Sequence, residues 1–394
     1  MNLDFTPEEQ AFREEARTWL AENLPTEERP PDGQPMREFD LAWQKTLFEG
    51  GWAGINWPKE FGGKGLNDIQ QMIWYEEFAR ADPPFTLNNS CTFVGNNHGG
   101  PTLIVSGTDE QKSFHLPKIL GGEVVWCQGF SEPGAGSDLA NLSCKAVIDG
   151  DELVVNGQKI WTSYAHVADY QELLVRTDPT APKHKGISWV ICDMKTPGIE
   201  IREITTMSHV NDFCEVFYDD VRIPLTNVVG QINDGWRVTM TTLSFERGTA
   251  FMADQVELAS VVERLIEEAR VRTGPDGKRP AIADDEIARR LALARAEVAA
   301  LKAMTIAGIS RTQRTGVPGP EGSMTRLFHG ELHQRVYQLA LDIIGPEALK
   351  LTPVDGNGWT GPYLQSFAYT IGGGTTDIQR NIVGERVLGL PRVK

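Results

Sequence analysis

The sequence predicts an α+β protein in which a block of helices, a compact β-domain and a second block of helices follow one another. The spacing of apolar residues is helical in the first third of the chain. It changes to short apolar runs separated by turn residues in the middle, and returns to helical spacing after Gly235. We therefore expect three domains, over residues 1–122, 123–232 and 233–394.

The first block opens with a complete helix-start signal. Thr6 is a capping hydroxyl, Pro7 occupies the first helical position, and Glu9 follows the cap by three residues. Apolar residues then recur along one face of the predicted helix. Thr108 and Gln111 repeat the same capping pattern before a second apolar stripe, so residues 1–122 are expected to be mainly helical.

The middle block has the turn chemistry of antiparallel strands. Asp149-Gly150-Asp151 and Asn156-Gly157 separate short apolar runs, and an Asn-Gly pair in that position is a strong hairpin signal. Strand-like segments continue to about residue 224, namely GISWVICDM, GIEIREI and CEVFYDDVRIP. These segments predict a β-domain of roughly a hundred residues.

Helical spacing in the last block predicts long helices. One runs from Trp236 to about Arg270, and RTGPDGKRPAIADD ends it. The next carries a single apolar stripe on residues 287–301, a third follows around 326–344, and a last short one starts near Asp377.

The bulk composition excludes several classes of partner. The net charge of −16 argues against nucleic acid or an anionic membrane surface, which both need a basic footprint. Five scattered cysteines fit reduced thiols, and neither they nor the seven histidines have metal-ligand spacing. The N-terminus lacks the basic flank and apolar core of a signal peptide, and no apolar run is long enough to span a bilayer. We therefore expect a cytoplasmic protein without a metal.

Two stretches offer groups that suit a flat or anionic ligand. QGFSEPGAGSDLANL, at residues 128–142, is rich in Gly, Ser and acids, and it is either a plain loop or a ligand cradle. It lacks the GxGxxG spacing and the βαβ context of a nicotinamide-binding fold. QKIWTSY places Trp161 and Ser163 on one face of a strand, which suits a heteroaromatic ring. For an isolated tryptophan, however, an aromatic side chain in the sheet core is the more common explanation.

LSFERGTA places Glu246 and Arg247 in a predicted helix. Glu246 shares a face with Leu243 and Ala250, so its carboxylate is either a poorly placed surface charge or a base in a pocket that raises its pKa. In the tail, TIGGGTTDIQR sets three glycines directly before a helix start. Such glycines either form a connecting turn or let the backbone approach a ligand.

Taken together, these segments resemble the acyl-CoA dehydrogenase family over essentially the whole chain. SEPGAGSD at 131–138, NGQKIWTS at 156–163 and GGGTTDIQRNIVGERVLGLP at 372–391 stand in the order and at the separations of the family's signature segments. The resemblance implies a sandwich or barrel-like β-domain and a C-terminal four-helix bundle. It also implies FAD as cofactor and desaturation of an acyl-CoA thioester between Cα and Cβ, with hydride passing to flavin N5.

The resemblance implies a role for individual residues. The Gln128–Ser131 segment would lie along the pyrimidine edge of the flavin, and Trp161 and Ser163 would flank the ring near N5. The residues it assigns to cofactor binding are Gln128, Phe130, Ser131, Trp161, Ser163, Arg272, Asp342, Thr375 and Asp377. Those it assigns to the substrate are Ser137, Ser244, Arg247 and Gly374.

The position of the catalytic base departs from many relatives. They carry a tail Glu where this chain has Gly373, whereas branched-chain and sterol-side-chain members carry Glu on the long helix directly before Arg, as in Glu246-Arg247. The resemblance therefore implies Glu246 as base for a branched or bulky acyl group. The backbone N–H of Gly373 would donate to the thioester carbonyl and stabilise the enolate.

Other departures concern the adenine end of the FAD site. RVRTGPDGKRP replaces the family's usual segment, and Asp342 and Pro346 stand where Gln and Gly are common. The implied partners are an electron-transfer flavoprotein as acceptor and further subunits in a homo- or heterotetramer. The alternatives are a non-catalytic or half-site subunit of a hetero-oligomer and a flavin monooxygenase on the same fold. A binding module without a cofactor leaves the Trp161 and Gly-rich segments unexplained.

Overall fold

The computed structural model describes residues 5–81, 83, 85, 90–246, 250–315, 319–354 and 358–391. The chain folds into two compact units. Unit 1 combines Met1–Thr26, Asn67–Phe85 and Arg247–Lys394, and unit 2 combines Glu27–Leu66 and Thr86–Glu246. The predicted division at residues 122 and 232 follows chain order, and it stays a prediction.

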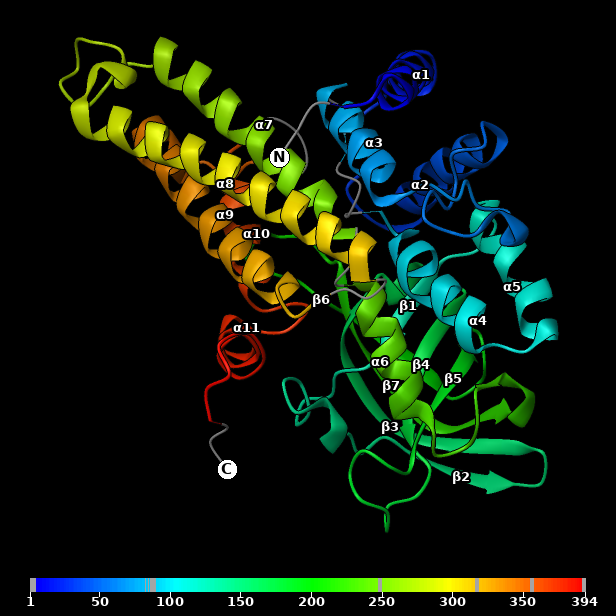
Figure 1. Ribbon diagram of the computed structural model, residues 1–394. Helices are drawn as coiled ribbons and strands as arrows, with labels where there is room; N and C mark the ends of the chain where they lie inside the picture. Colours follow the sequence, from blue (N-terminus) through cyan, green and yellow to red (C-terminus); the bar gives the residue numbers. More distant parts are fainter. Residues whose placement is uncertain are drawn as a thin grey trace. The chain divides into compact units, whose positions relative to one another are not determined.

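Unit 1 is helical. The long helices α7, α8 and α9 lie side by side (Figure 1). Apolar residues of these helices form one core, in which Leu265, Leu291 and Val336 are buried. Its helices are α1 (Pro7–Asn23), α3 (Asp68–Arg80), α7 (Ala250–Val271), α8 (Asp285–Thr315), α9 (Gly322–Ile344), α10 (Thr360–Ser366) and α11 (Thr376–Ile382).

The predicted start of the first helix is confirmed. The Thr6 side chain accepts from the Glu9 amide, and the Glu9 side chain accepts from the Thr6 amide, which is the capping box. Helix α1 packs on α3, where Arg13 donates to buried Glu77 at 2.6 Å. The apolar stripe predicted on residues 287–301 is also confirmed, because Ile287, Leu291, Ala294, Val298 and Leu301 are all buried on α8.

Unit 2 contains the sheet. Its strands are β1 (Trp126–Gly129), β2 (Lys145–Asp149), β3 (Glu152–Ser163), β4 (Tyr170–Arg176), β5 (Ile187–Asp193), β6 (Ile199–Ile204), β7 (Phe213–Pro224) and β8 (Val228–Val229). Its helices are α2 (Gly33–Glu49), α4 (Gly100–Ser106), α5 (Asp109–Leu120) and α6 (Gly235–Glu246). The strand order is β6-β7-β3-β2-β4-β5-β8, with β1 pairing in parallel to β4.

The sheet folds into two halves that face each other. Only Lys145 and Arg176 pair β2 with β4, so the order is nearly interrupted at that point. Residues from both halves, including Leu153 of β3 and Val190 of β5, share one buried core. This arrangement confirms the predicted α+β fold with a sandwich-like β-domain between two helical parts of the chain.

A second core covers the other face of the β1, β4 and β5 half. Trp126, Leu174 and Trp189 from these strands pack with Leu103 of α4 and Leu116 of α5. Strand β4 is consequently buried on both faces along its central five residues. Helices α4 and α5 therefore also hold β1 in place, the strand that contains Gln128.

The hairpin predicted at Asn156-Gly157 is wrong. Both residues lie inside β3, and the turn is formed by Asp149-Gly150-Asp151 between β2 and β3. The pairing of β3 with β7 instead shifts register between Val155 and Gly157, which is a bulge. A Cβ at Gly157 would lie 2.7 Å from the Cys144 Cα, so glycine is required by close packing rather than by a turn.

The helix predicted over residues 236–270 is described as α6 and α7. Residues 247–249 between them lie outside the described residues, so the continuity of this helix stays a prediction. Among the described helices, none combines the length and the apolar character that crossing a membrane requires. All five cysteines are free and buried.

Candidate functional site

The first site segment leaves the sheet at the end of β1 and is held against β3. The Phe130 carbonyl accepts from Lys159 Nζ at 3.0 Å. The Ser131 carbonyl accepts from the Ile160 amide, also at 3.0 Å. Two main-chain carbonyls thus fix the Gln128–Ser131 segment beside the strand that carries Trp161.

A buried ion pair supports this segment. Lys159 Nζ lies 2.8 Å from Glu132 Oε1, and the side chains are 0% and 5% exposed. Glu132 also accepts from the backbone amides of Ser143 at 2.6 Å and Cys144 at 2.8 Å. Burial alone would raise the pKa of Glu132, but Lys159 and these amides outweigh it and lower that pKa below its ordinary value. The carboxylate therefore ties three chain segments together.

Trp161 presents its ring at the surface of unit 2. The side chain is 55% exposed, and the backbone has a φ of 60° at a second register shift in β3. Thr162 is fully buried, while Trp161 and Ser163 are not. The alternative of an indole in the sheet core is wrong, and the expectation that these two residues share one face stays a prediction. Phe213 steadies the ring edge-on at 6.0 Å between centroids.

Of the other predicted residues, Phe130 is buried in the core of unit 2, whereas Ser137 and Ser244 lie on its surface. Ser137 is exposed in the loop after β1, next to Asp138, which pairs with Lys183. Ser244 is exposed on α6 and donates to the Thr241 carbonyl at 2.7 Å. Glu246 is the last residue of α6, but its side chain and the whole of Arg247 lie outside the described residues. The base assignment stays a prediction.

In unit 1, the glycine-rich tail forms a tight turn before a helix. Gly373 and Gly374 have positive φ values of 67° and 97°, which glycine adopts without strain. Gln379 Nε2 donates to the Gly373 carbonyl at 3.1 Å and to the Gly374 carbonyl at 3.2 Å. The Thr375 side chain caps α11 by accepting from the Ile378 amide, so the predicted helix start is confirmed.

Asp377 follows this cap and is exposed. It lies in the first turn of α11, where a carboxylate suits the helix end, and it pairs with Arg380 at 3.0 Å. The sequence-predicted residues Gly373, Gly374, Thr375 and Asp377 are therefore brought together in one turn. Arg326 Nη2 donates to the Gly372 carbonyl at 2.7 Å and anchors the start of the turn on α9.

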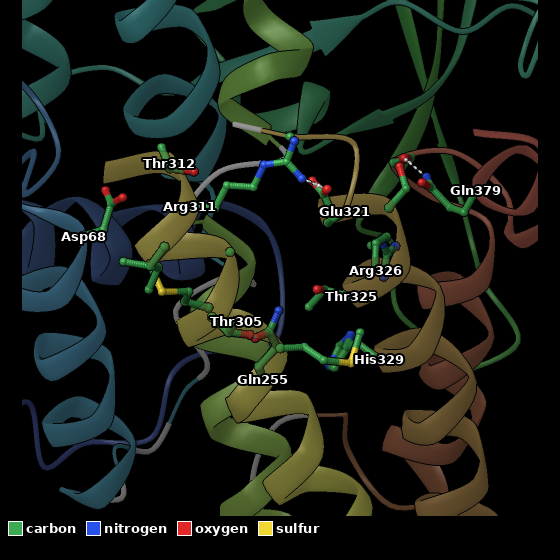
Figure 2. Close-up of a pocket in the computed structure, with 18 residues that line it drawn as sticks. Asp68, Gln255, Thr305, Arg311, Thr312, Glu321, Thr325, Arg326, His329 and Gln379 are labelled. Atoms are coloured by element: carbon green, nitrogen blue, oxygen red, sulfur yellow. Dashed lines mark hydrogen bonds and ion pairs between the residues drawn. The ribbon is translucent and has the colours of Figure 1, made fainter. Parts of the chain in front are cut away.

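Gly373 and Gln379 also line a cavity of about 190 Å³ within unit 1 (Figure 2). Residues of α7, α8 and α9 form most of its wall. Gln255 accepts a hydrogen bond from Thr305 between α7 and α8. His329 is 1% exposed, and its burial, together with His333 and Arg326, holds its pKa well below the ordinary value. The imidazole of His329 is therefore neutral at pH 7.

Arg272 and Asp342, predicted at the adenine end, are both engaged in ion pairs. Arg272 pairs with Glu268 and with Glu347, the latter at 2.8 Å. Asp342 pairs with Arg290 at 2.7 Å. Their roles toward a cofactor stay predictions, and each would have to exchange or share its present partner to bind one.

Sequence reasoning missed the buried polar side chains behind the site. They are Glu132, Lys159, His98 and Glu172. A charged residue inside an otherwise apolar strand, such as the Glu in YQELLVR, is the signal that could have identified them. Within the described residues, no group of three or more His, Cys, Asp or Glu side chains could hold a metal ion.

Three family models match this chain in sequence order. Residues 6–123 match the acyl-CoA dehydrogenase N-terminal domain, residues 127–221 the middle domain, and residues 233–388 the C-terminal domain. The acyl-CoA dehydrogenase IpdE1 of Mycobacterium tuberculosis is 40% identical over 389 residues, covering 97% of each chain.

Solved structures agree with these matches. The ChsE4-ChsE5 complex from Mycobacterium tuberculosis superposes with a TM-score of 0.84 at 33% identity, covering 100% of each chain. The Tcur3481-Tcur3483 steroid ACAD also superposes with a TM-score of 0.84, at 32% identity and again over 100% of each chain. Both matches extend over the helical and the sheet-containing parts.

Proposed function

Because the chain belongs to the acyl-CoA dehydrogenase family, we propose that it dehydrogenates an acyl-CoA thioester between Cα and Cβ with FAD as cofactor. The observation that carries this proposal is the exposed indole of Trp161 beside the anchored Gln128–Ser131 segment. The indole of Trp161 does not contribute to the core of unit 2, whereas Phe130 of the segment is buried in that core and anchors it. Both suit a flat ring with a polar edge.

The residues present fit a flavin. Trp161 offers an aromatic surface, Ser163 offers a hydroxyl two residues further along β3, and the loop from Gln128 offers polar groups. In unit 1, Thr375 and Asp377 at the start of α11 are the proposed contacts to the rest of FAD. When bound, the flavin supplies the acceptor for the hydride that leaves Cβ.

We propose Glu246 as the base that removes the α-proton. Two observations support this assignment: Gly373 has no side chain at the tail position, and Glu246 ends α6 in the LSFER segment. The Gly373 amide would donate to the thioester carbonyl. Arg326 supports that role because it donates to the Gly372 carbonyl, which lies in the same peptide plane as the Gly373 amide.

The proposed substrate carries a branched or bulky acyl group. Gly373 leaves space that a larger residue would fill, and one structural relative is a steroid ACAD. Ser137, Ser244, Arg247 and Gly374 are the proposed substrate contacts. We further propose an electron-transfer flavoprotein as acceptor, a cytoplasmic location, and a homo- or heterotetramer. ChsE4-ChsE5, a complex of two proteins, supports the hetero-oligomeric form.

The test is flavin bleaching by a panel of acyl-CoAs. The purified protein should be yellow, and at least one bulky acyl-CoA should remove the colour under anaerobic conditions. Protein that stays colourless after reconstitution with FAD would instead indicate a non-catalytic subunit. Rapid oxygen consumption by the reduced protein would indicate a monooxygenase.

The variant E246Q tests the base. It should bind FAD and acyl-CoA but bleach about 10²–10⁴-fold more slowly, because the amide cannot accept the α-proton. The matched control is E263Q, which changes a half-exposed glutamate of α7 paired with Arg295. E263Q should bleach at the wild-type rate. Wild-type bleaching by E246Q would remove the base assignment.

A further inference from the structure

A fully buried carboxylate lies directly behind the first site segment. Glu172 is 0% exposed on β4, and its two neighbours in the strand, Gln171 and Leu173, are also 0% exposed. Alternation along the strand turns Glu172 to the same side as Leu174, toward the helix layer of unit 2. Burying a carboxylate is costly, so its presence there requires specific polar partners.

Two of those partners are Gln128 and His98. Gln128 is the cross-strand neighbour of Glu172 in the parallel pairing of β1 with β4. Gln128 Nε2 lies 2.7 Å from Glu172 Oε1 and 3.2 Å from His98 Nδ1. His98, which is 6% exposed in the π-helical turn Gly95–Gly99, also lies 3.5 Å from the same Glu172 oxygen.

This geometry determines which way the Gln128 amide faces. The amide nitrogen of Gln128, and not the amide oxygen, faces Glu172 and donates to its carboxyl oxygen. One N–H is directed inward to Glu172, and the other is directed to His98 Nδ1, which accepts it when the imidazole carries its proton on Nε2. No described residue donates to Gln128 Oε1, and Gln128 is only partly buried. The side chain therefore presents a hydrogen-bond acceptor outward, beside Phe130 and Ser131.

We propose that Glu172 and His98 are positioning residues that hold the Gln128 amide so that its oxygen accepts from an imide N–H of the cofactor. This inference rests on the proposed function, because the pyrimidine edge of an isoalloxazine carries one N–H between two carbonyls. With the amide reversed, the NH2 group of Gln128 would face the imide N–H, and this opposition of two donors is unfavourable. Glu172 and His98 thus select a ring with a donor at this position.

The experiment compares the affinities of the apoprotein for FAD and for 3-methyl-FAD, in which a methyl group replaces the imide proton. Wild-type protein should bind FAD roughly tenfold more tightly, the effect of one hydrogen bond plus an acceptor left unsatisfied. Q128L removes the acceptor, so its affinity ratio should fall close to one. E172L removes the group that orients Gln128, and its ratio should fall in the same way.

E172Q is the isosteric variant. An amide at residue 172 can donate as well as accept, so it no longer enforces one orientation of Gln128, and the ratio should lie between those of wild type and E172L. If E172L does not fold, E172Q decides: a wild-type ratio in E172Q would overturn the proposal. The matched control is Q158L, which removes a Gln–Glu hydrogen bond of 3.0 Å elsewhere in the same sheet and should keep the wild-type ratio.

The outcomes separate the two proposals. Wild-type protein that binds neither flavin would contradict the FAD-dependent function itself. Protein that binds FAD and 3-methyl-FAD equally well would leave that function standing and overturn the role of Gln128. A ratio lost in Q128L but retained in both E172L and E172Q would show that Gln128 contacts the cofactor without help from Glu172.

Discussion

At the scale of single residues, buried polar groups decide how the site segments are held. Lys159, Glu132 and Glu172 each lie in or next to a strand where apolar side chains would be expected. Each has a polar partner on a different chain segment. Lys159 bonds to the Phe130 carbonyl and to Glu132, Glu132 accepts from the Ser143 amide, and Glu172 accepts from Gln128. Their cost is offset only when all these segments are in place, so they specify one geometry of the loop.

K159M should therefore be strongly destabilising. Removing the ammonium leaves Glu132 buried with its negative charge uncompensated, which costs about 3–5 kcal/mol of unfolding free energy. Denaturant unfolding monitored by circular dichroism measures the change. K183M is the control, because the Lys183–Asp138 pair is half-exposed on both sides and should contribute less than about 1 kcal/mol. Equal losses in the two variants would contradict the structural role of Lys159.

The pKa of Glu132 adds a pH dependence to the same comparison. That pKa is lower in the folded protein than its ordinary value of 4.5. The stabilisation is thus fully present at neutral pH and is lost as the pH falls through the folded-state pKa. The difference in stability between wild type and K159M should shrink in acid.

A second pH effect belongs to His115. Burial, followed by the nearby charge of Lys118, lowers its pKa to about 4 from 6.5. The ring packs edge-on against Trp126 at 5.2 Å and Tyr170 at 4.9 Å. Because the unfolded chain takes up the proton first, stability should fall as the pH drops from about 7 to 4. H115F should reduce this fall by roughly 1–3 kcal/mol, measured as unfolding free energy against pH. An unchanged slope would contradict the buried neutral ring.

At the scale of elements, predictions from local sequence patterns were confirmed where the interacting residues are close together in the sequence. The capping boxes at Thr6 and Thr108 and the stripe on α8 need only neighbours three or four residues away. The Asn156-Gly157 pair shows the limit of such signals. Its glycine is needed because Cys144 of the adjoining strand approaches closely, and no local pattern contains that contact.

G157A tests this explanation of the bulge. The new methyl group would meet the Cys144 backbone, so the variant should lose roughly 2–4 kcal/mol of unfolding free energy. G150A is the matched control in the neighbouring turn: Gly150 has a φ of 65°, but nothing lies within 4 Å of an added Cβ. It should cost only about 1–2 kcal/mol, the penalty of a left-handed backbone for alanine. A larger loss in G150A than in G157A would contradict the packing argument.

At the scale of the whole molecule, neither compact unit is one continuous stretch of the sequence. Unit 1 gathers three separate segments, and the first of them, with α1, covers α3 through Arg13, Arg17 and Glu77. These contacts bridge about sixty residues of sequence. Unit 2 contains no residue of that segment.

Deletion of residues 1–24 should therefore weaken unit 1 selectively. Without α1, Glu77 loses the hydrogen bonds from Arg13 and Arg17, and an apolar face of α3 becomes exposed. Hydrogen exchange should become at least tenfold faster in α3, while the amides of β3 and β4 keep their protection. Equal loss of protection in the sheet would show that the two units unfold together.

The sequence by itself determined the fold class, the order of the structural blocks, the helix starts at Thr6 and Thr108, and the family. These features rest on short-range patterns or on motifs that a chain displays without folding. The tertiary structure decided that Trp161 is exposed, that residue 157 lies in a bulge, and that Glu132 and Glu172 are buried. Each of these depends on contacts between strands or loops that are distant in sequence, and the energy of a buried charge is set by those contacts.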